Sequence, residues 1–240
     1  MIRDKLRITL EDDDELFSES APPAIVPVVI SSGRHGIEAE LYFSVYPAVA
    51  AFVNAHSEDL FEDETLKELN ELVAPYLLEK GYVREKQGNL RWYHSFAGYD
   101  HRKINTGLVK SNTKKLSSRH VENETTFDLD ELRKYKLPAF VTVVDRKVVS
   151  IATVNPYSEG QRMLEITAET APAYRKMGYG ASNVAALASY LLRHRYFVAY
   201  CCSRHNRASV KIARNVGLSH EGKFYAIDAY RKDTMEREES

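Results

Sequence analysis

The sequence has 240 residues, of which 44% are hydrophobic, and it carries 33 basic and 34 acidic side chains. This length suits one large domain or two small ones, and a formal net charge of −1 gives no overall electrostatic reason to expect binding to nucleic acid or to a membrane. We expect a cytoplasmic protein, because no apolar run approaches the roughly 20 residues of a membrane span and the N-terminal segment lacks the pattern of a signal peptide.

The first hundred residues show only weak patterns. The acidic run at 11–15 is typical of a solvated segment or a flexible arm. An apolar run at 24–30 predicts a strand, and Pro27 favours an edge position for it. The other elements predicted here are two helices, at 47–56 and 64–80, and a strand at 89–96. Pro75 is expected to kink or divide the second helix.

A short helix is predicted at 128–136, and after Pro138 the pattern is clearer. Two β-branched runs at 139–144 and 148–154 predict a hairpin. The remaining elements are a strand at 163–170, a helix at 181–193, a strand buried on both faces at 196–202, a helix at 207–216 closed by Gly217, and a strand at 224–230. The order β-β-β-α-β-α-β predicts an α/β (α+β) fold with a mixed sheet and helices packed on it.

The segment YRKMGYGASN, residues 174–183, combines two cations with two glycines at the start of a predicted helix. The first turn of a helix leaves backbone N–H groups unpaired and carries partial positive charge. Gly178 and Gly180 allow an anion to approach that backbone closely, so a phosphate cradle is one interpretation and a plain tight turn is the other. A P-loop is excluded because Gly-Lys-Ser/Thr is missing, and a dinucleotide fingerprint fails because Asn183 replaces its third glycine.

A second block follows the buried strand: Asn206-Arg-Ala-Ser209, and then Gly217-Leu218. Together with Pro172-x-Tyr-Arg-x-x-Gly-x-Gly180, this block resembles the GNAT superfamily of acyl-CoA-dependent N-acyltransferases. The resemblance covers residues 105–230, and Glu221-Gly222 extends it. It implies a mostly antiparallel sheet in which the strand at 163–170 separates from its neighbour after a bulge.

The resemblance also implies a site for coenzyme A. The diphosphate is expected at the amides of 177–181, and the pantetheine arm is expected along the strand at 163–170. Asn206 is expected to bind the pantetheine or a water beside it, or to act only as a helix N-cap for Ser209. The full set of expected cofactor-binding residues is Ala168, Thr170, Arg175, Lys176, Met177, Gly178, Tyr179, Gly180, Ala181, Asn206 and Ser209. Arg207, Lys211 and Arg214 either assist the phosphates or form a solvated helix face.

Direct attack on a thioester needs a base, because a primary amine is protonated at neutral pH. Glu165 and Glu169 are the candidate bases on the strand at 163–170, with a rim or hydrogen-bonding role as the alternative for each. A main-chain N–H near 168–170 is expected to stabilise the oxyanion. The family's usual acid, a tyrosine seven residues after the asparagine, is replaced by Ala213. Tyr225 is the candidate substitute, with Tyr200 and His205 as alternatives.

No covalent intermediate is needed, so Cys201 and Cys202 are expected to be core residues and not nucleophiles. They are adjacent in a predicted strand and point to opposite faces, so a disulfide between them is not expected. The eight histidines show no paired spacing of the kind found in zinc sites, and no metal is expected.

The sequence thus predicts an N-acetyltransferase that moves an acetyl group from acetyl-CoA to a small-molecule or peptide amine. The alternatives are a catalytically weak acyl-CoA-binding regulatory protein and an interaction module whose glycines only make a turn. We expect an N-terminal module at 1–104, the transferase domain at 105–232 and a flexible tail at 233–240. The N-terminal module is interpreted as a lid over the acceptor site, a degenerate copy of the fold, or the surface of a homodimer.

Overall fold

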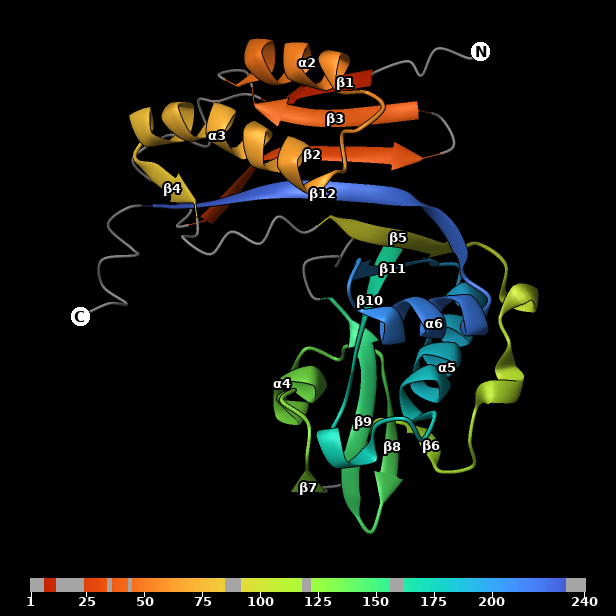
Figure 1. Ribbon diagram of the computed structural model, residues 1–240. Coiled ribbons are helices and arrows are strands. Elements are labelled where there is room, and N and C mark those ends of the chain that lie inside the picture. Colours follow the sequence, from red (N-terminus) through yellow and green to blue (C-terminus); the bar gives the residue numbers. More distant parts are fainter. Residues whose placement is uncertain are drawn as a thin grey trace. The chain divides into compact units, whose positions relative to one another are not determined.

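The computed structural model describes residues 7–11, 24–33, 36–42, 45–84, 92–117, 122–155 and 162–231. The chain divides into two compact units, an N-terminal unit of Met1–Tyr93 with Gly222–Ser240 and a central unit of His94–Glu221 (Figure 1). The division differs from the expected one, because residues from 222 onward join the N-terminal unit. The expected tail at 233–240 lies outside the described residues.

The N-terminal unit contains strands in the order β1-β3-β2-β12, and β4 also pairs with β12. The strands are β1 (Arg7–Glu11), β2 (Ala24–Gly33), β3 (Gly36–Tyr42), β4 (Tyr82–Arg84) and β12 (Ser219–Arg231), of which β1 and β3 run parallel. The predicted helices are present as α2 (Tyr46–Ala55) and α3 (Asp63–Glu79). Their apolar faces join those of the strands in one core. Of the acidic run at 11–15, predicted to be a solvated segment or a flexible arm, only Glu11 lies within the described residues, and it ends β1.

Pro27 departs from expectation, and one of the two effects expected of Pro75, division of the helix, does not occur. Pro27 does not mark an edge strand, because β2 lies between β3 and β12. The pairing of β2 with β3 begins only at Val28, and the pairing with β12 is irregular between Ile227 and Ala229, opposite Pro27. The missing N–H of the proline therefore falls where the ladder is already interrupted. Pro75 does not divide α3, which continues through it from Asp63 to Glu79.

The central unit contains strands in the order β5-β11-β10-β9-β8-β6, and β7 pairs with β9. The strands are β5 (Tyr93–Gly98), β6 (Thr113–Lys115), β7 (Glu122–Asn123), β8 (Ala139–Val144), β9 (Lys147–Val154), β10 (Met163–Thr170) and β11 (Phe197–Ser203). The helices are α4 (Leu129–Lys134), α5 (Tyr179–Arg193) and α6 (Arg207–Val216), with short 3-10 turns η1 (His101–Lys103), η2 (Thr106–Leu108) and η4 (Pro172–Tyr174). The predicted mixed, mostly antiparallel sheet flanked by helices is confirmed.

Helices cover both faces of the central sheet (Figure 1). Phe140, Ala152 and Ile166 pack with α5 and α6 in one core. Val141 and Ile151, their neighbours in the two-residue alternation of a strand, pack with α4 in a second core. Strands β10 and β11 therefore lie in a sheet whose two faces are both covered by helices.

Candidate functional site

Strands β10 and β11 are paired along only part of their length. Parallel pairing joins residues 163–165 of β10 to residues 197–199 of β11. Residues 166–170 of β10 pair with β9 on the other side, and their register shows no shift. The two strands thus separate after Glu165 and leave a gap in the sheet. The expected separation is present, without a bulge in the paired stretch 166–170.

The peptide groups of Ala168 and Thr170 face this gap. The carbonyl of Glu165 and the N–H of Ala171 are both hydrogen-bonded on the side of β9. Peptide groups alternate in direction along a strand, so residues 168 and 170 point the opposite way, toward β11. The Nε of Arg175 donates to the carbonyl of Thr170 at 3.2 Å. The gap therefore offers backbone donors and acceptors that the sheet leaves open for a ligand.

The N-terminus of α5 is open to an anion. Gly178 precedes the helix in the left-handed conformation, with φ of 81°, and no side chain caps the helix. The first intrahelical bond runs from the N–H of Ser182 to the carbonyl of Gly178. The N–H groups of residues 179–181 are thus the unpaired donors of the first turn. A Cβ on Gly180 would lie 3.2 Å from Thr170 Oγ1 and 3.3 Å from Ile212 Cδ1, so a side chain there would crowd the space between the helix and the gap.

A single cavity of about 690 Å³ joins the strand gap to this helix N-terminus. All the expected cofactor-binding residues except Met177 line this cavity, and Met177 is 51% exposed. The lining residues are Ala168, Glu169, Thr170, Tyr174, Arg175, Lys176, Gly178, Tyr179, Gly180, Ala181, Tyr200, Asn206, Ala208, Ser209, Lys211, Ile212 and Asn215. The fold therefore brings residues that are up to 47 positions apart in the sequence, from Ala168 to Asn215, around one cavity.

A buried polar network fixes the start of α5. Ser182 Oγ accepts the backbone N–H of Lys110 at 2.9 Å and lies 2.7 Å from Thr113 Oγ1. Asn183 bonds to Thr142 Oγ1 and Ser150 Oγ, each at 3.0 Å. Ser182 and Asn183 are both fully buried. Asn183 stands where a dinucleotide fingerprint would have glycine, and its side chain ties the helix to β8 and β9.

Lys110 is a residue that the sequence did not reveal. Its Cε lies 3.3 Å from the position of a Cβ on Gly178, and its Nζ lies 5.9 Å from the centre of the Tyr179 ring. It adds a third cation, beside Arg175 and Lys176, to the N-terminus of α5. No local pattern could have found it, because Lys110 reaches α5 only through the fold.

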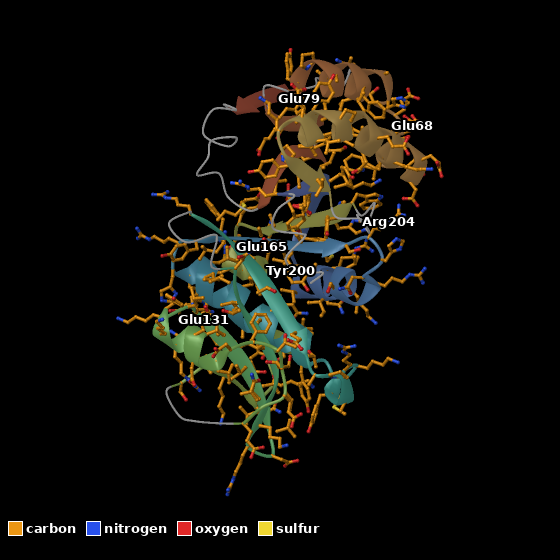
Figure 2. All side chains as sticks on the ribbon, turned by 90° about the vertical axis from the view of Figure 1, so that its left-hand side faces the viewer. Glu68, Glu79, Glu131, Glu165, Tyr200 and Arg204 are labelled. Atoms are coloured by element: carbon orange, nitrogen blue, oxygen red, sulfur yellow. The ribbon has the colours of Figure 1, made fainter. Side chains whose placement is uncertain are left out.

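Glu165 lies at the closed end of the gap, on the sheet face opposite α5 and α6. Its carboxylate is hydrogen-bonded to the thiol of Cys201, which lies in β11. Glu165 is labelled in Figure 2. Burial and then the charge of Glu165 raise the pKa of Cys201 to about 12, while a hydrogen bond to Ser95 acts in the other direction. Burial also raises the pKa of Cys202, to about 11. Both sulfurs are free thiols, with Cys201 partly buried and Cys202 buried.

Glu169 is held by a loop. Its Oε2 accepts the backbone N–H of Thr126 at 2.9 Å and the hydroxyl of Thr126 at 2.7 Å. Glu169 lines the cavity, but two hydrogen bonds fix its carboxylate. These contacts favour the hydrogen-bonding role for Glu169 over the role of base.

The two tyrosines considered as acids lie in different units. Tyr225 belongs to the N-terminal unit, where its buried hydroxyl is hydrogen-bonded to Asn70. Tyr200 belongs to the central unit and lines the cavity, and it is labelled in Figure 2. Burial raises the pKa of Tyr200, and a hydrogen bond with Ser209 partly offsets that rise. Tyr200 is therefore a buried, protonated phenol in the cavity.

Asn206 acts as the N-cap of α6. Its Oδ1 accepts the N–H of Ser209 at 3.1 Å, and both residues also line the cavity. Gly217, with φ of 94°, ends the helix as predicted. Ala213 lies fully buried in the core between them. His205, the other alternative acid, is exposed next to Arg204.

Within the described residues, no cluster of three or more His, Cys, Asp or Glu side chains is arranged to hold a metal ion. No helix in the same part of the chain is long and apolar enough to cross a membrane.

No family model and no curated protein matches the sequence. Several solved structures are similar in fold at low identity. One is a GCN5-related N-acetyltransferase-like protein from Streptococcus suis 89/1591, with TM-score 0.46 and 14% identity, covering 89% of this chain and 85% of that chain. A GNAT-family acetyltransferase structure from Novosphingobium aromaticivorans has TM-score 0.47 and 11% identity, covering 63% and 68%. A tandem GNAT protein from the clavulanic acid biosynthesis pathway has TM-score 0.43 and 12% identity, covering 65% and 57%.

Proposed function

We propose that this protein is a GNAT-type N-acyltransferase that moves an acetyl group from acetyl-CoA to a primary amine. The observation that carries the proposal is the single cavity that joins the strand gap to the uncapped N-terminus of α5. A ligand with a diphosphate at one end and amide groups along its length matches both parts. The amine acceptor, the cytoplasmic location and the role of the N-terminal unit stay predictions.

The residues present fit coenzyme A. The unpaired N–H groups of 179–181 and the cations of Lys110, Arg175 and Lys176 suit a diphosphate. The peptide groups of Ala168 and Thr170 suit the amides of the pantetheine arm. When bound, acetyl-CoA supplies an acetyl group already activated as a thioester.

The chain offers an acid and a base on opposite faces of the sheet. Glu165 stands on the face away from α5 and α6, and Tyr200 stands on the face toward them, both at the closed end of the gap. In this proposal a carboxylate oxygen of Glu165 takes the proton that the attacking amine loses as the new C–N bond forms. The Tyr200 hydroxyl gives its proton to the sulfur as the C–S bond breaks. The N–H groups of Ala168 and Thr170 are candidates to stabilise the carbonyl oxygen.

Ligand-induced stabilisation tests the cofactor half of the proposal. Thermal unfolding would be followed with acetyl-CoA, ATP and NAD, for the wild type, Gly180→Glu and the control Gly107→Glu. Gly107 is an exposed glycine of η2 outside the cavity lining. Acetyl-CoA at a hundred times its Kd stabilises the folded state by about 2.7 kcal/mol. We expect a shift with acetyl-CoA alone, kept in Gly107→Glu and lost in Gly180→Glu; equal shifts in both variants would contradict the cradle.

The absence of a phenol at Ala213 favours a second candidate, an acyl-CoA-binding regulatory protein with little turnover. Both candidates bind the cofactor, so turnover separates them. Release of free coenzyme A would be measured with a panel of amines, including polyamines, aminoglycosides, amino acids and peptide N-termini. Turnover that needs one amine class supports the transferase, and binding without turnover on any of them supports the regulatory protein.

A further inference from the structure

A second hollow, of about 370 Å³, lies beside the cofactor cavity in the central unit. It is lined by His94 of β5, by Arg204, which follows β11 (Figure 2), and by one face of α6. We call it the basic groove, and its lining residues are His94, Arg204, Arg207, Val210, Lys211, Arg214 and Asn215. Lys211 and Asn215 also line the larger cavity, so α6 forms a common wall of the two spaces.

The charged residues that line the groove are all basic. Arg207, Lys211 and Arg214 are four and three positions apart, which places them on one face of α6. All three are exposed, and in the part of the chain that the structure describes none of them forms an ion pair. The described lining residues include no acid. Like charges at this spacing destabilise a helix, so an anion that bound among them would relieve the repulsion.

The histidine of the groove adds to this character. His94 Nδ1 lies 3.1 Å from His220 Nε2, so an N–H of one ring donates a hydrogen bond to the nitrogen of the other. The two rings are held close, with centroids 5.2 Å apart. An imidazole held at the wall of the groove can donate to an anion there, and its NMR signal reports on what binds.

We propose that the basic groove binds a phosphate monoester. Arginine forks match the oxygens of such a group, and two arginines of α6 and Arg204 line the groove. The phosphate has two sources: the 3′-phosphate of coenzyme A lying in the adjoining cavity, or a phosphate carried by the acceptor. The first source, coenzyme A, rests on the proposed function. The second source, a phosphate on the acceptor, does not require that coenzyme A binds.

Calorimetry on the full chain tests the first source. The ligands are coenzyme A and 3′-dephospho-coenzyme A, which differ only in that phosphate. The proteins are the wild type, the groove variant Arg207→Gln/Arg214→Gln, and the control Lys114→Gln/Lys134→Gln, which removes two exposed charges outside both linings. Gln keeps the helix propensity of the positions, and Lys211 is left in place because it also lines the cofactor cavity. We expect the wild type and the control to prefer coenzyme A about tenfold or more, and the groove variant to lose most of that preference.

Inorganic phosphate tests the groove without the cofactor. Its binding would be followed by the imidazole signals of His94 and His220 in the same three proteins. Signals that shift in the wild type and control but not in the groove variant support a phosphate site, and assign it to the acceptor if the two coenzymes bind equally. Equal binding of the coenzymes together with unchanged imidazole signals overturns the proposal. If neither coenzyme binds at all, the proposed function fails, and the phosphate titration still decides the groove.

Discussion

The Nδ2 of Asn183 donates to Ser150 Oγ at 3.0 Å, inside the first turns of α5, and joins the helix to β9. The same side chain accepts from Thr142 Oγ1 of β8 at 3.0 Å. Ser150 Oγ in turn lies 2.8 Å from Thr170 Oγ1, at the end of β10 that lines the cavity. One buried amide therefore links the phosphate cradle to three strands of the central sheet.

Replacing this amide is expected to destabilise the fold. Asn183→Ala removes one hydrogen-bond partner from each of two buried hydroxyl groups and leaves a small void, so we expect the free energy of unfolding to fall by roughly 1–3 kcal/mol. Urea unfolding measures the change. Asn215→Ala, at an exposed position of α6, is the control and should change stability by less than about 0.5 kcal/mol. Equal losses in the two variants would refute the role of the network.

Gly178→Ala is expected to cost about 1–2 kcal/mol, because residue 178 has φ of 81° and a Cβ is strained in that conformation. The new methyl group would also press on Lys110 Cε, which lies 3.3 Å away. Chemical denaturation gives the stability, and acetyl-CoA titration gives the effect on the cradle. Gly107→Ala, at an exposed glycine of η2, should leave both quantities nearly unchanged; a loss of the same size there would remove the conformational argument.

Tyr200→Phe is expected to lower turnover about a hundredfold and to leave acetyl-CoA affinity nearly unchanged, since only the proton donor is lost. The deficit should shrink when the donor is an acetyl thioester of a more acidic thiol, which leaves without protonation. Tyr190→Phe is the control, because the Tyr190 hydroxyl accepts from Lys115 Nζ at 3.0 Å, outside the cavity lining. A deficit independent of the leaving thiol would argue that Tyr200 only supports packing.

Glu165→Gln should lower turnover by about a hundredfold or more if the carboxylate is the base. It should also lower the pKa of Cys201, because the negative charge that helps to raise it is gone. The rate of Cys201 alkylation at fixed pH reports that change without any acceptor amine. All variants would carry Cys202→Ala, so that Cys201 is the one thiol that can react. Glu169→Gln, which loosens the Thr126 loop, should leave the Cys201 rate unchanged. A Cys201 rate that does not respond to Glu165→Gln would contradict the contact.

The raised pKa of Cys201 predicts a loss of stability in alkali. Below its ordinary value of 9.0 the thiol is protonated in both states, so it contributes no pH dependence. Between pH 9 and about 12 the unfolded chain loses a proton that the folded chain keeps, and the free energy of unfolding falls by about 1.4 kcal/mol per pH unit. Urea unfolding across that range should show a shallower slope for Cys201→Ala than for the wild type. Identical slopes of unfolding free energy against pH in the two proteins would mean that the fold does not raise the pKa of Cys201.

Local patterns predicted the part of the fold that contains the site. The bounds of β10 and α6 match the prediction to the residue, and Asn206 caps α6 as expected. Helix α6 carries its own start and stop signals, the cap Asn206 at one end and Gly217 at the other. The strand gap was implied by the resemblance alone, because periodicity does not show which strands pair.

Other features depend on tertiary contacts, and one follows from a local pattern. Residues 37–41 alternate buried apolar and exposed acidic side chains in β3, and this two-residue period is typical of a strand. Pro27 suggested an edge because the interruption of the ladder comes from β12, some two hundred positions away. Lys110 reaches the cradle for a similar reason, through a bond to Ser182.

The division of the N-terminal unit between the two ends of the chain bears on the order of folding during synthesis. β2 pairs with β12, so residues 24–33 wait for residues 222–230 before their ladder is complete. The central unit is continuous and emerges from the ribosome in between, and it can reach its fold first. Until Tyr225, Ile227 and Ala229 arrive, the core of the N-terminal unit lacks three of its buried residues, and β2 presents an open edge to other chains. A nascent chain from which residues up to 221 have left the ribosome should therefore expose this edge to chaperones and proteases while its central unit is already protected.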